Sequence, residues 1–123
     1  MDFQPGDILR SKKTKHPIIF LDEIHVDSFC GCIITHASSS QYPENIKLAR
    51  KHFLDSDLQG KAFSIQWDQT YFVDVKLEKK KDWGPFTRQG KLSDEGLKFL
   101  HDYLNNKKPK IWTDFLKEKR SST

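Results

Sequence analysis

The first two thirds of the chain carry short apolar runs and alternating apolar and polar positions, and both patterns predict β-strands. Ile18 to Leu21 is an unbroken apolar run between loops, which favours a short buried strand over a helix. Phe63, Ile65 and Trp67 alternate with polar residues, as in a strand with one buried face. The predicted strands cover residues 7–10, 16–21, 29–36, 61–67 and 71–77.

The last third of the chain predicts helices. Ser93 is a favourable N-cap, and two acidic residues follow it in the first turn, where the helix dipole stabilises negative charge. Leu97, Leu100 and Leu104 then form one apolar stripe at helical spacing. The polar segment Asn-Asn-Lys-Lys-Pro follows and ends the helix. A further short helix is predicted at residues 111–116.

Other segments interrupt these patterns. Residues 22–28 are polar and are expected to connect two strands of a hairpin. Residues 37–45 include three consecutive serines and are expected to form a surface loop. Residues 46–53 fit either a helical face or a strand edge, and both interpretations remain open. The lysine run at residues 79–81 is expected to be a solvated loop.

Strands first and one long helix last predict an α+β fold that is mainly β. Short strands joined by loops favour a small SH3-like barrel with a C-terminal helix. The 123 residues suit a single domain over residues 1–123, with a barrel core at about 4–78 and a C-terminal helical part at about 92–118. Nine Phe, three Tyr and three Trp supply large side chains for its core.

The charge of the chain permits contact with phosphate but does not require it. The formal net charge is +4 and the sequence pI is about 9.0. Charged residues make up 31% of the chain, with both signs interspersed, so a solvated lysine-rich surface is the favoured explanation of the excess. Charge alone therefore favours no particular partner.

The cysteines and the apolar runs indicate a reduced, membrane-free environment. Cys30 and Cys32 lie two residues apart on a predicted strand, a spacing that disfavours a disulfide, and no second cysteine pair completes a zinc site. Buried reduced thiols suit a cytoplasmic protein. The N-terminus lacks a signal core, and no apolar run is long enough to span a bilayer.

Short motifs along the chain resemble, in order and spacing, those of the MazF/PemK family of bacterial toxins from residue 4 to about residue 104. The family begins with a Gly-Asp/Glu-Ile turn, continues with Arg-Pro before an apolar strand, and ends that region with an apolar-Thr-Ser strand. Asp-Gln and a helix that starts with Leu-Ser/Pro follow. The corresponding segments here are Gly6-Asp7-Ile8, His16-Pro17, Ile33-Ile34-Thr35, Asp68-Gln69 with Asp74, and Leu92-Ser93.

The resemblance implies a function in a toxin–antitoxin system. Members of the family are small SH3-like barrels that form homodimers and pair with an antitoxin protein. They are endoribonucleases that cleave single-stranded RNA without a metal or another cofactor. A base takes the proton of the 2′-hydroxyl, an acid protonates the leaving 5′-oxygen, and a cation stabilises the charged phosphorane.

The same resemblance implies a set of catalytic residues, namely His16, Thr35, Asp68 and, behind them, His36. His16 stands where the family has a catalytic arginine, and it could act as acid or base but lacks the fixed forked charge. Thr35 matches the family's active-site threonine, although a threonine is also common in any strand. Asp68-Gln69 is also typical of a turn. A regular strand would place Thr35 and His36 on opposite faces.

Four cations are expected to border an RNA groove: Arg10, Lys12, Lys13 and Lys15. Arg10 could supply the missing positive charge, while a lysine-rich loop is also common on any solvated surface. A second expected arginine is absent, because Gln66 stands two residues before Asp68. The two departures favour an alternative function, a non-catalytic barrel that binds a protein or nucleic-acid partner.

Overall fold

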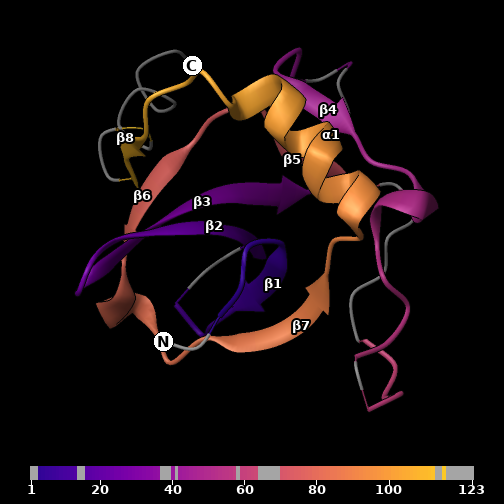
Figure 1. Ribbon diagram of the computed structural model, residues 1–123. Coiled ribbons are helices and arrows are strands. Elements are labelled where there is room, and N and C mark those ends of the chain that lie inside the picture. The colour runs from indigo at the N-terminus through magenta and orange to yellow at the C-terminus, as the bar shows by residue number, and fades with distance from the viewer. Residues whose placement is uncertain are drawn as a thin grey trace.

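The computed structural model (Figure 1) describes residues 3–13, 16–36, 40, 42–57, 59–63, 70–112 and 115. The fold is α+β and mainly β, as the sequence predicts. The strands are β1 (Asp7–Arg10), β2 (Ile18–His25), β3 (Ser28–Thr35), β4 (Asn45–Lys47), β5 (Tyr71–Val73), β6 (Leu77–Lys80), β7 (Thr87–Lys91) and β8 (Lys110–Ile111). The helices are α1 (Asp94–Leu104) and two 3₁₀ turns, η1 (Arg50–His52) and η2 (Lys81–Trp83).

The sheet is built around the long hairpin of β2 and β3. Its strand order is β4-β5-β3-β2-β1-β7, and β6 pairs with β3 and with β8. The outer edge of β3 is shared, because Gly31 and the residues before it pair with β6, whereas Ile34 and Thr35 pair with β5. Residues 74–76 bend between β5 and β6. The single strand predicted at residues 71–77 is therefore wrong, because the chain turns there from one half of β3 to the other.

No ladder of the described residues joins the two ends of this sheet. β4 and β7 are its ends, and the chain that follows β4 passes through η1 to Phe53, which forms an isolated antiparallel bridge with Leu92. The Leu54 amide donates to the Lys91 carbonyl at 2.9 Å. The sheet curls and a bridge links its ends, but it is not closed, so the closed SH3-like barrel is not confirmed.

The β2–β3 hairpin is longer than predicted. Residues 22–25 continue β2, and only residues 26 and 27 form the turn. Gly31 lies where two strands approach closely, because a Cβ there would lie 2.6 Å from Ile18 Cγ2. A glycine lets β2 and β3 approach each other at this point without a clash.

Three apolar clusters fill the space around the curled sheet. The largest lies between the sheet and α1, which covers one end of the sheet beside β4 and β5 (Figure 1). Leu100 and Leu104 are fully buried there, which confirms the predicted stripe. Cys30 and Cys32 belong to the same cluster as free thiols, also as predicted. The two smaller clusters are Leu9, Ile18, Phe20, Phe29 and Phe86, and Ile33, Val73, Leu77 and Phe115.

The N-terminus of α1 is fixed by its predicted cap. Ser93 Oγ accepts a hydrogen bond from the Gly96 amide at 3.1 Å and donates one to the Lys51 carbonyl at 2.6 Å. Gly96 lies against η1 so closely that a Cβ there would clash with the His52 backbone. Residues 46–53, for which the sequence allowed a strand edge or a helical face, contain a short strand edge in β4 and one turn of 3₁₀ helix.

Two predictions near the C-terminal part of the fold are corrected. The lysine run is no solvated loop, because Lys79 and Lys80 lie in β6 and Lys79 is only 1% exposed. The helix predicted at residues 111–116 is confirmed only in part, because Ile111 lies in β8, parallel to β6, whereas Trp112 and Phe115 are helical. In the described part of the chain, no helix is long and apolar enough to cross a membrane.

Candidate nucleic-acid interface

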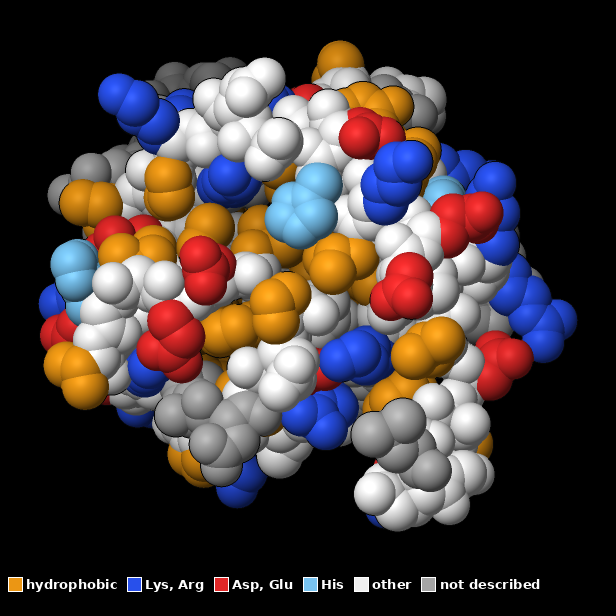
Figure 2. All heavy atoms as spheres, viewed as in Figure 1, with side chains coloured by type: hydrophobic (Ala, Val, Ile, Leu, Met, Phe, Trp, Pro, Cys, Tyr) orange, Lys and Arg blue, Asp and Glu red, His pale blue; other side chains and the backbone are white. Residues whose placement is uncertain are grey.

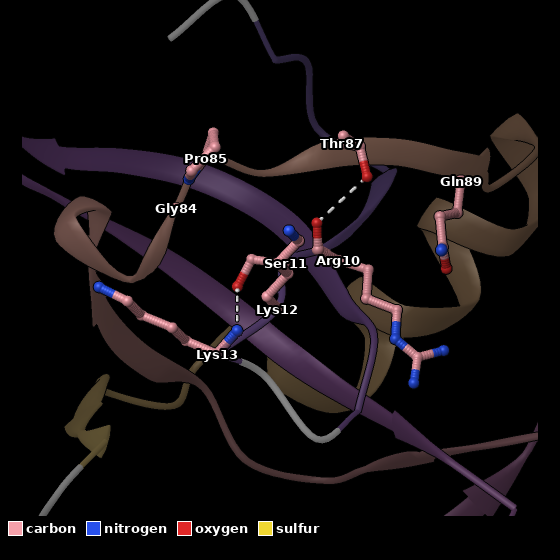
Figure 3. Close-up of a pocket in the computed structure, with 8 residues that line it drawn as sticks. All are labelled: Arg10, Ser11, Lys12, Lys13, Gly84, Pro85, Thr87 and Gln89. Carbon is pink, nitrogen blue, oxygen red and sulfur yellow. Dashed lines mark hydrogen bonds between the residues drawn. The ribbon is translucent and has the colours of Figure 1, made fainter.

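A groove of about 700 Å³ lies where the end of β1 meets the start of β7 (Figure 3). Its first wall consists of residues 10–13, at the end of β1 and the start of the loop that follows. The opposite wall comes from the turn after η2 and from β7. The lining residues are Arg10, Ser11, Lys12, Lys13, Gly84, Pro85, Thr87 and Gln89.

Hydrogen bonds hold the two walls in register. Arg10 pairs with Thr87 across the β1–β7 ladder, and Thr87 Oγ1 donates to the Arg10 carbonyl at 3.3 Å. The Lys13 amide donates to Ser11 Oγ at 3.2 Å, which turns the loop, and Lys13 Nζ donates to the Asp82 carbonyl at 3.2 Å. These bonds therefore connect the first wall, which carries the lysines, to β7 and to η2.

The groove gathers positive charge. Arg10, Lys12 and Lys13 are all exposed, and none of the described residues that line the groove is acidic. By contrast, acidic and basic side chains are interspersed on the face drawn in Figure 2. Cations of one sign around a concave surface attract polyanions, because they raise the local concentration of negative ligands.

A β-bulge in β7 shapes the inner end of the groove. Ile8 pairs with Gly90, whereas the next residue, Leu9, pairs with Arg88, so β7 has one extra residue at this point, Gln89. Such a bulge bends a strand and redirects a side chain. Gln89 places an amide, which both donates and accepts hydrogen bonds, at the lining of the groove.

The structure therefore brings together three of the four cations that the sequence nominates. Arg10, Lys12 and Lys13 line one groove. Lys15, the fourth, lies outside the described residues. Sequence reasoning missed Thr87 and Gln89, because only the β1–β7 pairing brings them beside the basic loop.

The β2–β3 hairpin locates two of the predicted catalytic residues. Ile18 pairs with Ile33, and the Ile34 amide donates to the Pro17 carbonyl at 3.0 Å. β2 begins at Ile18 and residue 16 lies in a bend, so the regular ladder ends before His16. His16 precedes β2 and Thr35 ends β3, which puts both at the same end of the hairpin.

The other predicted catalytic residues are placed less favourably. Thr35 is 8% exposed and lies in β3, paired with Tyr71, whereas His36 is exposed just beyond the strand. Strand alternation directs His36 away from the face of Thr35. Asp68 lies outside the described residues. The roles of His16, Thr35, His36 and Asp68 stay predictions.

The end of β1 lies between the groove and the start of β2. Leu9 pairs with Ile18 in the last pair of the β1–β2 ladder. Ser11 follows β1 and lines the basic groove, whereas His16 precedes β2 and is half-buried. The groove therefore lies at the same end of the sheet as His16 and Thr35.

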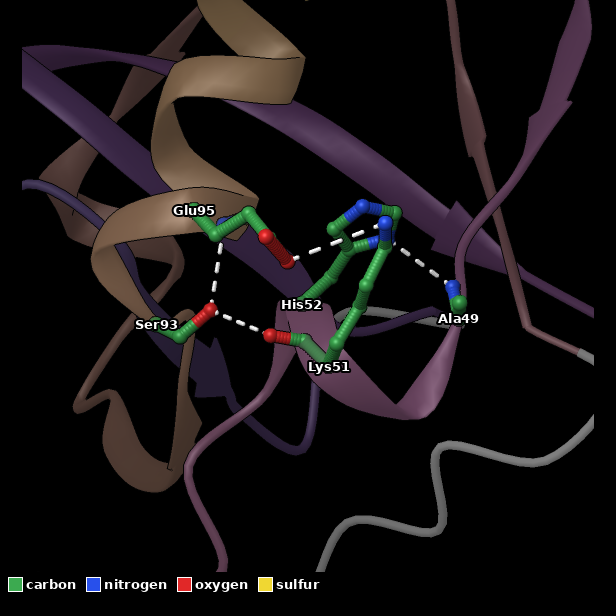
Figure 4. Close-up of polar contacts among 6 residues, drawn as sticks. Ala49, Lys51, His52, Ser93 and Glu95 are labelled. Atoms are coloured by element: carbon green, nitrogen blue, oxygen red, sulfur yellow. Dashed lines mark hydrogen bonds and ion pairs between the residues drawn. The ribbon is translucent and has the colours of Figure 1, made fainter.

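A second polar cluster joins η1 to α1 (Figure 4) and has a structural explanation. His52 Nδ1 accepts from the Ala49 amide at 2.9 Å, and its ring stacks on Phe99 with centroids 4.4 Å apart. Burial lowers the pKa of His52, and nearby Lys51 lowers it further. Lys51 Nζ lies 3.8 Å from Glu95 Oε2. These contacts connect η1 to α1 and so stabilise the fold at this junction.

Lys79 is the most unusual titratable group in the described structure. Its Nζ lies 3.8 Å from the centre of the Trp112 ring. Burial lowers its pKa to about 7, while Asp82 acts in the opposite direction. The ring favours the charged amine and burial disfavours it. The side chain packs against Trp112 and has almost no contact with solvent, since Lys79 is only 1% exposed.

The cysteines have no features of a nucleophile. Burial raises the pKa of Cys30 and of Cys32. Cys32 Sγ donates to the Val73 carbonyl at 3.0 Å. A protonated, buried thiol is unreactive. The described residues also contain no group of three or more His, Cys, Asp or Glu that could hold a metal ion.

No protein-family model matches this chain, and no curated protein matches it in sequence. The geometry of the basic groove and its neighbours is therefore the basis for assigning a function.

Proposed function

We propose that this protein binds single-stranded RNA in the groove between the end of β1 and the start of β7. The observation that carries the proposal is the convergence of Arg10, Lys12 and Lys13 on one groove whose described lining contains no acidic residue. Thr87 and Gln89 add neutral hydrogen-bonding groups on the opposite wall. Phosphates bind such cations, and neutral polar groups contact sugars and bases.

The dimensions of the groove favour a single strand over a duplex. Its volume of about 700 Å³ is that of a small-molecule site and suits a few unpaired nucleotides. Proteins that bind single strands combine a positive groove with neighbouring polar and aromatic groups, and they accept flexible chains that can follow a short concave path.

The fold supports the same proposal in the finer form that the motifs suggest. The edge of β3 that β5 and β6 share, and the bridge that links the sheet ends, are compatible with an SH3-like barrel. Together with the ordered motifs, this leads us to propose that the chain is a toxin of the MazF/PemK type. In this proposal it is a cytoplasmic homodimer that is controlled by an antitoxin protein.

Binding is tested by fluorescence anisotropy with the full chain and a short labelled oligouridine RNA. We expect the logarithm of the affinity to fall linearly with the logarithm of the salt concentration, with a slope of about −2, because three cations replace condensed counterions. A double-stranded RNA of equal length should bind more weakly. No salt-dependent binding to the single strand would refute the proposal.

RNA cleavage is a second candidate function, favoured by the position of His16 and Thr35 at the same end of the sheet as the basic groove. His16 would take the proton of the 2′-hydroxyl, whose oxygen attacks the adjacent phosphate and forms a 2′,3′-cyclic phosphate. The 5′-oxygen leaves and receives a proton from the imidazolium or from water. Arg10 would stabilise the charge on the phosphorane.

Cleavage is tested by incubating the protein with RNA of mixed sequence in a buffer that contains a metal chelator. We expect fragments that end in a 2′,3′-cyclic phosphate, and we expect His16→Ala to abolish them. His25→Ala is the matched control, since His25 is an exposed residue at the end of β2. Intact RNA in the wild-type reaction would leave binding as the function of the groove.

A further inference from the structure

A second recess adjoins the basic groove and shares one residue with it. Its volume is about 380 Å³, and it lies between β7 and the segment that precedes residue 64. Gln89, the bulge residue of β7, lines both hollows. The remaining lining residues of the recess are Asp57, Gln59, Lys61, Ala62, Phe63 and Arg88.

The outer wall of the recess is a small hairpin held by its own hydrogen bonds. Ser56 and Ala62 form an isolated antiparallel bridge, and the Phe63 amide donates to the Asp55 carbonyl at 3.0 Å. Asp57 Oδ1 accepts from the Lys61 amide at 2.9 Å, and also from the amide of residue 59. These bonds fix the Asp57 carboxylate and leave its Oδ2 as an acceptor.

The charge of the recess differs from that of the groove. Arg88 Nη2 lies 2.8 Å from Oδ2 of the fully buried Asp7, but Lys91 Nζ also pairs with this carboxylate at 3.3 Å, so Asp7 compensates the Arg88 charge only in part. Asp57 and Lys61 carry opposite charges. The recess is therefore less positive than the groove. A phosphate gains less there, whereas a neutral planar group can use the Phe63 ring and the polar atoms beside it.

We infer that the recess binds one nucleobase of the RNA strand, guanine in preference to the other bases, and that Gln89 connects this site to the basic groove. The inference rests on the proposed RNA binding. Guanine presents two adjacent N–H donors on its Watson–Crick edge, and the recess offers one acceptor for each, Asp57 Oδ2 and the Gln89 amide oxygen. The ring of Phe63 offers a surface for stacking, and the Gln89 amide can bond a base or a ribose hydroxyl.

The test uses the full chain and four labelled oligouridine RNAs that differ at one central position, which is G, A, C or U. We expect wild type to bind the guanosine RNA roughly tenfold more tightly than the other three, as for one well-placed pair of hydrogen bonds. Gln89→Leu and Phe63→Leu should each reduce this preference at least severalfold. Thermal melting checks that both variants fold.

Lys12→Ala is the matched control, because it should weaken binding to all four RNAs by the same factor and leave the preference unchanged. Equal affinity of wild type for the four RNAs would overturn the recess assignment while the proposed RNA binding stands. A guanine preference that persists in both leucine variants would overturn it too. Failure of wild type to bind any of the RNAs would overturn both.

Discussion

The two ends of β7 are built differently. At its start, Thr87 and Gln89 line a groove whose basic residues are exposed on a loop. Just beyond its end, Ser93 begins α1 and interlocks with η1, where Gly96 contacts the His52 backbone and the His52 ring stacks on Phe99. The charged side chains that line the groove are exposed, whereas the polar groups at the junction of η1 and α1 form hydrogen bonds within the fold.

This difference separates residues for binding from residues for stability. A side chain that contacts only solvent in the groove can be removed at little cost to folding. A side chain that fills the η1–α1 junction cannot be changed without shifting a neighbouring backbone. Substitutions at the two ends should therefore act on different measurements, and the following variants test that separation.

Gly96→Ala should have the largest effect. Alanine favours a helix by about 1 kcal/mol over glycine. At this position, however, its Cβ would lie 2.9 Å from the His52 Cα and closer still to the carbonyl group. We expect a loss of about 3 kcal/mol in the free energy of unfolding, measured by urea denaturation.

The control for this variant is Lys98→Ala, at an exposed position of the same helix, which should change stability by less than about 0.5 kcal/mol. RNA affinity of the folded Gly96→Ala protein should stay unchanged. A variant as stable as wild type would show that η1 and α1 do not pack as described.

Replacing Arg10, Lys12 and Lys13 together by alanine should have the next largest effect. We expect RNA affinity to fall roughly 100-fold at low salt, about 2.7 kcal/mol, with a salt slope near zero. Anisotropy titrations measure both quantities. The melting temperature should stay close to that of wild type.

The matched control removes the same charge elsewhere, through alanines at Lys47, Lys98 and Lys108, all exposed and none lining the groove. If this control loses as much affinity as the groove variant, overall charge and not the groove determines binding.

Lys79→Met should stabilise the protein. The methionine keeps apolar volume under Trp112 and removes a buried amine. Because the pKa of Lys79 is lowered from its ordinary 10.5 to about 7, the folded state binds fewer protons between these values. Stability of wild type should then rise with pH from 7 upward.

We expect Lys79→Met to gain about 2 kcal/mol at pH 7 and to reduce that pH dependence. Urea denaturation at neutral and alkaline pH measures both. Lys80→Met, at the exposed neighbouring position, is the control. A destabilised Lys79→Met protein would mean that the contact of the charged amine with Trp112 outweighs the cost of burial.

His52 should make the protein sensitive to mild acid. Its pKa is lowered by burial, so the unfolded state binds more protons and stability falls as the pH drops below about 6.5. His52→Asn can still accept from the Ala49 amide and should lose about 1 kcal/mol of stability through packing, with a weaker acid dependence. Melting curves from pH 5 to 8 test this, and an unchanged acid dependence in the variant would assign the effect to other groups.

Much of the framework follows from the sequence. The Ser93 cap and the leucine stripe of α1 are local signals, and both are confirmed. The apolar runs locate β2 and β3, although polar residues 22–25 extend β2 because it pairs along its full length with β3. The bend at residues 74–76 could not be predicted, since it depends on which half of β3 each strand joins.

The lysines show most clearly why the site could be predicted only in part. Lys12–Lys13 and Lys79–Lys80 look alike in the sequence, but the first pair lines a groove and Lys79 is buried beneath Trp112. Neighbouring residues along the chain do not determine this difference. Thr87 and Gln89 likewise join the site only through long-range pairing and a register shift.

The most direct measurement of where RNA binds is an NMR titration of the ¹⁵N-labelled full chain with a short single-stranded RNA. The amides of Arg10 to Lys13 and of Thr87 to Gln89 should shift progressively, while those at the centre of α1, such as Leu100, should not. Shifts confined to α1 or η1, or no shifts at RNA concentrations that saturate anisotropy, would contradict binding in the basic groove.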